Sequence, residues 1–197
     1  MDASVWGPPL WTILFDIAMK CEADDRQKLK RLMRLLEYNL PCPDCRVSLT
    51  SHRKKIESLD IDILQEPVKW LWTVQDMVNQ KLDKPPVNID LVLRRLKAYS
   101  CYINDFMIID TMVVIYKGSK QKYSAEVILT LQTLSELLLH AHRYLKVPSL
   151  ILAATWEDID ETLFSAKNQM LRLYQMPATS RVEFDQQYTN ALSEKSV

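Results

Sequence analysis

Two cysteines three residues apart are the strongest candidates for chemistry in this sequence. Cys42 and Cys45 lie in the segment LPCPDC, next to Pro41 and Pro43, and a basic segment follows them. A pair with this spacing can close and reopen a small disulfide ring without large backbone movement, and the attacking species in such an exchange is a thiolate. The N–H groups at the beginning of a helix, together with the nearby Arg46, favour a thiolate. The pair therefore predicts a redox disulfide at the first turn of a helix.

A metal site is the main alternative for the same pair. Structural zinc usually takes four protein ligands, and the remaining candidates are Cys21, Cys101 and three histidines. There is no second C-x-x-C motif, and His140 and His142 would point to nearly opposite sides of a helix. The ligand set is incomplete, so we favour redox chemistry and predict no metal ligands. Cys21 and Cys101 are single cysteines, and the sequence does not decide whether they pair.

The composition excludes several other functions. The chain has 197 residues, and 48% of them are hydrophobic, which is enough apolar material for a folded core. Lys and Arg total 25, as do Asp and Glu, so the basic excess typical of nucleic-acid binding is missing. Gly7 and Gly118 are the only glycines, too few for a glycine-rich phosphate loop. We expect no nucleic-acid partner, and any nucleotide must be bound in another way.

Neither a signal peptide nor a transmembrane segment is predicted. The first residues lack a charged stretch followed by an apolar one. The most apolar run, residues 103–116, contains Asp105 and Asp110 and is shorter than the ~20 residues that span a bilayer. Cysteines in a protein without an export signal are better explained by catalysis or metal binding than by a disulfide scaffold. We therefore expect a cytoplasmic protein that does not contact membranes.

The elements that hold the cysteine pair are predicted to be helices. Scarce glycine and apolar residues spaced three and four apart indicate an all-α protein, with a bundle of four or five helices followed by a second helical region. The helices are expected after Pro8-Pro9, at 24–37, from the cysteine pair onward, at 66–82, after Asn88, and at 103–116, 124–146 and 156–175. The polar segment after Met176 is expected to be a loose tail. The predicted units are residues 1–101, 102–176 and 177–197.

Three segments, in this order, resemble the Erv/ALR family of FAD-linked sulfhydryl oxidases. WGPPLWTILF (residues 6–15) is similar to the family's WGP-x-x-W-x-x-L-H opening. LPCPDC (residues 40–45) is similar to its active-site cysteine pair. LWTVQDMVNQKLDKP (residues 71–85) is similar to its flavin helix, L-W-x-x-H-N-x-V-N-x-K-L-x-K-P. The resemblance covers residues 5–97, and the ordered trio is far more specific than a single C-x-x-C.

The resemblance implies an activity and a set of roles. Such an enzyme forms disulfides in protein dithiols and passes the electrons through FAD to molecular oxygen, which gives hydrogen peroxide. The resemblance implies that Cys42 meets the incoming thiolate and that Cys45 contacts the isoalloxazine. Trp72 also belongs here, because it shares one helical stripe with three residues of the flavin helix. The implied FAD-binding residues are Trp6, Gly7, Trp11, Phe15, Cys45, Trp72, Gln75, Val78, Asn79, Lys81, Leu82 and Lys84.

Two departures from the family pattern keep other functions open. Phe15 stands where the family has a histidine, and Gln75-Asp76 replaces its His-Asn pair. Phe15 can pack on a ring but cannot donate a hydrogen bond, whereas Gln75 keeps both a donor and an acceptor. These changes favour a second hypothesis, a catalytically inactive helical scaffold that binds partners through its C-terminal half. A structural zinc protein built on the cysteine pair is the third.

The second half of the chain is longer than in the small cellular members of the family. In this it resembles the enlarged enzymes of large DNA viruses, which implies a place in the host cytoplasm and in the virion. Family members are often dimeric, so we expect a homodimer. Residues 103–175 are predicted to pack against the redox domain as a pseudo-dimer partner or to form the dimer surface. No second C-x-x-C is present, so substrates are expected to reach Cys42 directly.

Overall fold

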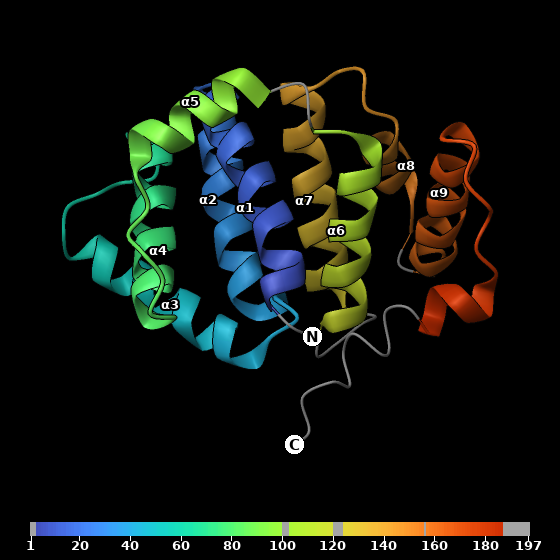
Figure 1. The fold of residues 1–197 in the computed structure, drawn as a ribbon, viewed down its shortest axis with the longest axis horizontal. Coiled ribbons are helices and arrows are strands. Elements are labelled where there is room, and N and C mark those ends of the chain that lie inside the picture. The colour runs from blue at the N-terminus through green and yellow to red at the C-terminus, as the bar shows by residue number, and fades with distance from the viewer. Residues whose placement is uncertain (1–2, 100–102, 120–123, 156, 187–197) are drawn as a thin grey trace.

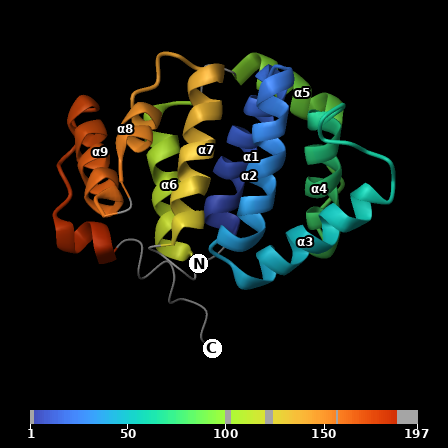
Figure 2. The same ribbon diagram turned by 180° about the vertical axis from the view of Figure 1, so that it is seen from behind.

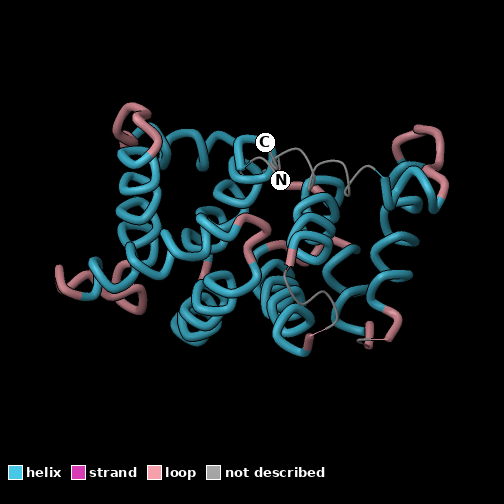
Figure 3. Tube along the Cα trace, turned by 90° about the horizontal axis from the view of Figure 1, so that it is seen from below, coloured by secondary structure: helices cyan, strands magenta, loops and turns pink. Residues whose placement is uncertain are grey.

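The described part of the protein is helical, as predicted. The computed structural model describes residues 3–99, 103–119, 124–155 and 157–186. Its helices are α1 (Ala3–Lys20), α2 (Ala23–Asn39), α3 (Pro43–Glu57), α4 (Pro67–Lys81), α5 (Ile89–Tyr99), α6 (Asp105–Gly118), α7 (Ala125–Ala141), α8 (Val147–Ala153) and α9 (Ile159–Leu173). Seen from below, these residues form helices and loops without a strand (Figure 3). The all-α prediction is therefore confirmed.

Four helices that lie side by side form the centre of the molecule. Helices α1, α2, α6 and α7 run roughly along one direction (Figure 1). Helices α3 and α4 cover one end of this group and α5 crosses it, while α8 and α9 cover the other end (Figure 2). One hydrophobic core runs through all four central helices and includes Ile13, Leu29, Ile108 and Leu131, which have no exposed side-chain surface. Burial of this apolar surface holds both halves of the chain together.

The second half of the chain packs directly on the first. Helix α7 lies against α2, and α6 lies against α1. Residues 103–175 were predicted to pack against the redox domain as a pseudo-dimer partner or to form the dimer surface, and this role stays a prediction. The homodimer and the domain boundaries at 101 and 176 stay predictions. None of the described helices combines the length and the apolar character needed to cross a membrane.

Helix α1 begins earlier than its prolines predict. It starts at Ala3, so Pro8 and Pro9 lie inside the helix and not in its first turn. A proline inside a helix removes a backbone hydrogen bond, which normally favours a helix start at that point. Here the apolar face continues backward through Leu10 to Trp6, and both side chains are buried. Tertiary packing therefore extends the helix across the two prolines.

Helix α7 ends earlier than the predicted boundary at residue 146. It stops at Ala141, and a separate short helix, α8, begins at Val147. The carboxylate of Asp105 accepts hydrogen bonds from the backbone N–H groups of Lys146 (2.9 Å) and Val147 (2.7 Å), which satisfies free donors at the beginning of α8. This contact with a distant aspartate stabilises the beginning of α8, and the local sequence pattern does not reveal it.

Residues 177–186 differ from the predicted loose tail. A helical turn over residues 181–186 packs against α9, and Phe184 is fully buried with its ring centroid 5.3 Å from that of Phe164. Asp185 accepts a hydrogen bond from Lys117 at 2.9 Å, and Arg181 pairs with Asp160. One aromatic side chain and these ion pairs therefore hold this otherwise polar segment against α6 and α9. The rest of the predicted tail lies outside the described residues.

Candidate functional site

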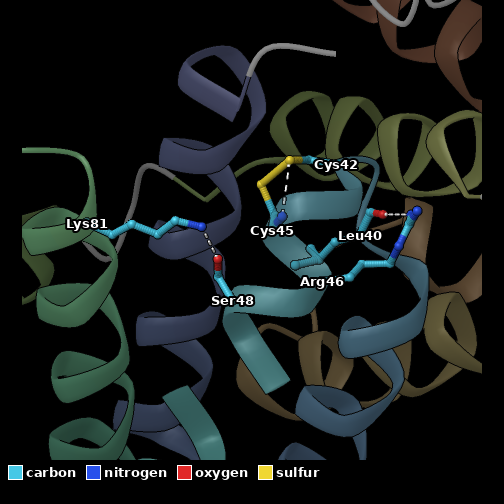
Figure 4. Close-up of a disulfide and its surroundings, with 6 residues drawn as sticks. All are labelled: Leu40, Cys42, Cys45, Arg46, Ser48 and Lys81. Atoms are coloured by element: carbon cyan, nitrogen blue, oxygen red, sulfur yellow. Dashed lines mark hydrogen bonds between the residues drawn. A yellow bond between two sulfur atoms is a disulfide. The ribbon is translucent and has the colours of Figure 1, made fainter. Parts of the chain in front are cut away.

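The predicted redox pair lies at the beginning of α3 and forms a disulfide. Cys42 is the residue just before the helix, and Cys45 is in its first turn (Figure 4). The two Cα atoms are 5.1 Å apart. The backbone N–H of Cys45 donates to Cys42 Sγ at 3.2 Å, so this sulfur occupies the place that an N-capping oxygen usually has. The positive end of the helix dipole and this N–H both stabilise negative charge on Cys42.

Arg46 holds the backbone next to the disulfide. Its guanidinium Nη1 donates to the carbonyl of Leu40 at 2.5 Å, and Figure 4 shows its side chain directed toward that carbonyl. The sequence predicts that Arg46 supports a thiolate through its charge. In the structure this side chain also fixes the turn that leads from α2 into Cys42.

A large cavity lies beside the disulfide. Its volume is about 1000 Å³, and it is enclosed by α1, α2, α3, α4 and α5. Both cysteines line it, together with apolar and aromatic side chains. Of the predicted FAD-binding residues, the structure brings together around this cavity Trp6, Gly7, Trp11, Phe15, Cys45, Gln75, Val78, Asn79, Lys81, Leu82 and Lys84.

Trp72 is the predicted ligand-binding residue that does not line the cavity. Its indole N–H donates to the carbonyl of Val87 at 2.7 Å, and its ring packs against the core. The other three residues of the predicted helical stripe, Gln75, Asn79 and Leu82, all line the cavity. Trp72 begins this stripe and holds the segment that follows α4.

Two buried polar atoms on the cavity wall have no hydrogen-bond partner among the described residues. They are Trp6 Nε1 and Gln75 Oε1. Buried polar groups are nearly always paired, because an unpaired one costs about 1–3 kcal/mol. A donor and an acceptor left open on the wall of one cavity fit a polar, aromatic ligand. Gln75, which replaces the family's histidine, therefore keeps a polar group at the cavity.

Phe15 and Asp76, which also differ from the family pattern, have different environments. Phe15 is buried on the cavity wall, with its ring centroid 6.2 Å from that of Trp11, so it contributes a flat apolar surface. Asp76 is not among the lining residues. Its carboxylate accepts from the backbone N–H of Val87 (3.0 Å) and from Gln80 (2.7 Å), and it thereby holds the loop after α4.

Basic side chains lie at the mouth of the cavity. Lys81 and Lys84 are exposed and line it, and Lys81 Nζ donates to Ser48 Oγ at 2.6 Å, which connects α4 to α3 (Figure 4). His52 lies further along α3. Burial, and then the charges of Lys81 and Lys55, lower the pKa of His52, which keeps its ring neutral. Lys81 and Lys84 therefore place two positive charges at the cavity, where the exposed Asp44 also lies.

Several cavity residues were not predicted. Ser48 and Leu49 lie on the same face of α3 as Cys45, at spacings of three and four, and this spacing could have identified them. Met33 and Leu36 of α2 share an apolar pattern with the core, so the sequence does not distinguish a cavity wall from a packed interior. The further lining residues are Ala3, Ser4, Pro8, Leu10, Thr12, Leu14, Asp16, Leu40, Cys42, Asp44, Val92 and Ile103.

The remaining cysteines and histidines do not form a second site in the described residues. Within that part of the chain, no group of three or more His, Cys, Asp or Glu side chains gathers where a metal could bind. The thiol of Cys21 donates to the Ala18 carbonyl at 3.3 Å, and burial raises its pKa. Cys101 lies outside the described residues, so its pairing with Cys21 is untested. His140 and His142 contact Asp25 and Asp16.

The fold and the site together define a helical disulfide protein with a large aromatic cavity beside its redox-type cysteine pair. The sequence model of the Erv1 / Alr family matches residues 6–97, which extend from α1 into α5. This part of the chain belongs to the Erv1 / Alr family, which confirms the predicted resemblance. Members of this family are in general FAD-binding sulfhydryl oxidases. No curated protein and no solved structure matches the chain.

Proposed function

We propose that this protein is a FAD-dependent sulfhydryl oxidase that forms disulfides in protein dithiols. The observation that carries the proposal is the position of the disulfide: Cys42 and Cys45 lie on the wall of the cavity that also contains the residues of the flavin-helix motif. A redox-active pair and a site for a flat cofactor therefore share one surface. Membership of the Erv1 / Alr family supports the same reaction.

The chemistry of the cavity fits FAD. A volume of about 1000 Å³ is at the upper end of the range for small-molecule sites. Trp6, Trp11 and Phe15 supply aromatic surface for a ring system, and the open polar atoms of Trp6 and Gln75 supply a donor and an acceptor. Lys81 and Lys84 at the mouth suit a pyrophosphate. The remaining residues proposed to hold the cofactor are Gly7, Val78, Asn79 and Leu82.

The cysteine pair carries out the exchange with substrate. A substrate thiolate attacks Cys42 Sγ, the disulfide breaks, and Cys45 leaves as a thiolate in the first turn of α3. The second substrate thiolate then attacks the mixed disulfide and releases Cys42, whose sulfur accepts the Cys45 N–H. The substrate loses two protons and two electrons, and the two cysteines hold these electrons. Bound FAD would supply the path by which these two electrons leave the cysteine pair for molecular oxygen, which would give hydrogen peroxide.

Spectroscopy and oxygen consumption test this function. We expect the purified protein to be yellow, with an absorption band near ~450 nm, and to consume oxygen with a model dithiol. Cys42→Ser and Cys45→Ser should each abolish turnover, because each removes one sulfur of the exchanging pair. Cys21→Ser is the matched control and should retain activity, since Cys21 contacts neither the pair nor the cavity. Full turnover in both site variants would contradict the proposal.

An inactive scaffold is the second candidate, and one observation favours it. Phe15 occupies a histidine position of the family and cannot donate a hydrogen bond to a cofactor. A scaffold would be colourless and would not consume oxygen, so the same two measurements separate the candidates. The expected homodimer, the viral origin and the location in host cytoplasm and virion are proposals that rest on the resemblance alone.

A further inference from the structure

The segment that leads into Cys42 is attached to the second half of the chain. Asn39, the last residue of α2, is buried, and its Nδ2 donates to Thr130 Oγ1 (2.9 Å) and to the Glu126 carbonyl (3.3 Å), both in α7. Its Oδ1 accepts from Ser119 Oγ, just after α6, at 3.5 Å. The amide group of Asn39 is therefore bonded on both sides by residues outside the part that matches the family.

A glycine allows the same half to approach Pro41. A Cβ atom placed on Gly118 would lie 2.3 Å from Pro41 Cβ and 2.8 Å from Pro41 Cα, which is closer than real side chains come. One of these atoms belongs to the backbone, so a flexible side chain cannot move away to make room. Gly7, in contrast, has open space at the corresponding position. Gly118 is required by this contact and not by its backbone conformation.

These contacts end next to the sulfur that receives the substrate thiolate. Pro41 directly precedes Cys42, and Cys42 Sγ accepts the Cys45 N–H only while the chain enters α3 in its present direction. We propose that α6 and α7 position Cys42, with Gly118, Asn39 and Thr130 as positioning residues that keep its sulfur at the N-cap of α3. The consequence for turnover rests on the proposed function. The consequence for the disulfide itself does not.

The positioning of Cys42 by α6 and α7 should affect how easily the Cys42–Cys45 disulfide is reduced. An N–H donor and a helix N-terminus stabilise the Cys42 thiolate, and stabilising the reduced form makes a disulfide easier to reduce. If Pro41 is pushed away from α6, this sulfur leaves its N–H donor. The reduced form then loses stability, and the equilibrium with glutathione moves toward the disulfide.

Gly118→Ala tests the proposal most directly. The fraction of the Cys42–Cys45 pair that is oxidised is measured by thiol alkylation in glutathione buffers of increasing reducing strength. We expect the equilibrium constant for reduction to fall by about threefold or more, which is the order of change expected when one N–H hydrogen bond is lost. Thr130→Val, which removes one acceptor from Asn39, should shift it in the same direction by a smaller factor.

Thr133→Val is the matched control. Thr133 is buried in the same helix, three residues after Thr130, and has no part in the contacts with Asn39 or Pro41. Its replacement should leave the equilibrium constant unchanged, although the loss of a buried hydroxyl is the same. If Gly118→Ala does not fold, Thr130→Val decides alone. The proposal would be overturned if Gly118→Ala and Thr130→Val, or whichever of them folds, had the same equilibrium constant for reduction as the wild type.

The alkylation experiment tests the positioning of Cys42 independently of the proposed oxidase reaction. Alkylation reads the cysteine pair directly and needs neither FAD nor oxygen. A colourless protein whose equilibrium still shifts in Gly118→Ala would support the positioning role and contradict the proposed oxidase. A yellow, active protein whose equilibrium does not shift in Gly118→Ala would support the proposed oxidase and contradict the positioning role.

Discussion

The two halves of the chain fill the space between their helices in different ways. In the second half, side chains of α6 and α7 pack closely, and Ile108, Met112 and Leu131 have no exposed surface. In the first half, α1, α2, α3, α4 and α5 line a cavity of about 1000 Å³. None of the described side chains of α5 is buried, and its Leu91 is 48% exposed.

This difference separates closely packed regions from a region that can take a ligand. The second half contributes closely packed side chains to the shared core, and hydrophobic stabilisation follows the apolar area that is buried. The half that matches the Erv1 / Alr family places apolar side chains such as Val92 on the wall of the cavity, where a ligand can pack against them. The two halves share one hydrophobic core, and they are also joined by buried polar contacts whose removal should be costly.

The largest expected effect comes from breaking the buried polar contact between the halves. His142 Nε2 lies 2.5 Å from Asp16 Oδ2, both side chains are 3% exposed, and Lys20 Nζ lies 3.0 Å from the same nitrogen. His142→Ala leaves the Asp16 carboxylate with Lys20 as its remaining partner in this group. Removing one partner of a buried pair costs about 3–5 kcal/mol, and the remaining lysine places the expected loss near the lower value. Urea unfolding measures this loss.

His140→Ala is the control for this prediction. His140 also pairs with an aspartate across the two halves, with its Nδ1 2.7 Å from Asp25 Oδ1, but its own side chain is 58% exposed. Asp25 is buried but keeps Lys28 Nζ at 4.0 Å, and the exposed His140 ring is readily replaced by water, so this variant should lose clearly less stability than His142→Ala. Equal losses in the two variants would show that burial of the contact is not what couples the halves.

A smaller effect is expected from filling the cavity. FAD at 100 times its dissociation constant should raise the free energy of unfolding by about 2.7 kcal/mol, because the ligand binds the folded state alone. Hydrogen exchange should slow mainly in α4 and α5, whose side chains border the cavity, and much less in α6 and α7. Gln75→Ala should weaken this protection by removing one polar contact. Protection confined to α6–α9 would contradict the assignment of the cavity.

Local features of the site could be predicted from the sequence, and distant contacts could not. The helix start at Cys42 follows from the proline at the first helical position and from the spacing of the pair, which are properties of neighbouring residues. The contact between Asp16 and His142 joins residues 126 positions apart, and neither lies in a motif. The burial of Phe184 and the extension of α1 across its prolines likewise depend on partners that only the folded chain brings near.

The face of α4 shows where helical periodicity stops being sufficient. Gln75, Asn79 and Leu82 line the cavity as their spacing predicts, while Trp72, on the same stripe, bonds to Val87. Spacing gives the direction in which a side chain leaves its helix. It does not give the position at which the loop after the helix returns, and that loop covers Trp72.

The smallest expected effect is the acid sensitivity of the contact between the halves. Burial alone would raise the pKa of Asp16, but its hydrogen bonds with His142 and Lys20 outweigh burial and lower that pKa below the usual value near ~4. The unfolded chain therefore takes up a proton at higher pH than the folded protein does. The carboxylate contributes stability above pH ~4, and this contribution disappears as the pH falls through the lower pKa of the folded state.

Protonation keeps the side chain in place, so the loss should be smaller than that of His142→Ala. Unfolding free energies of the wild type and Asp16→Asn between pH 7 and pH 3 measure it. The difference between the two proteins should shrink toward acid, and a difference that stays constant would show that the charge of Asp16 does not couple the halves.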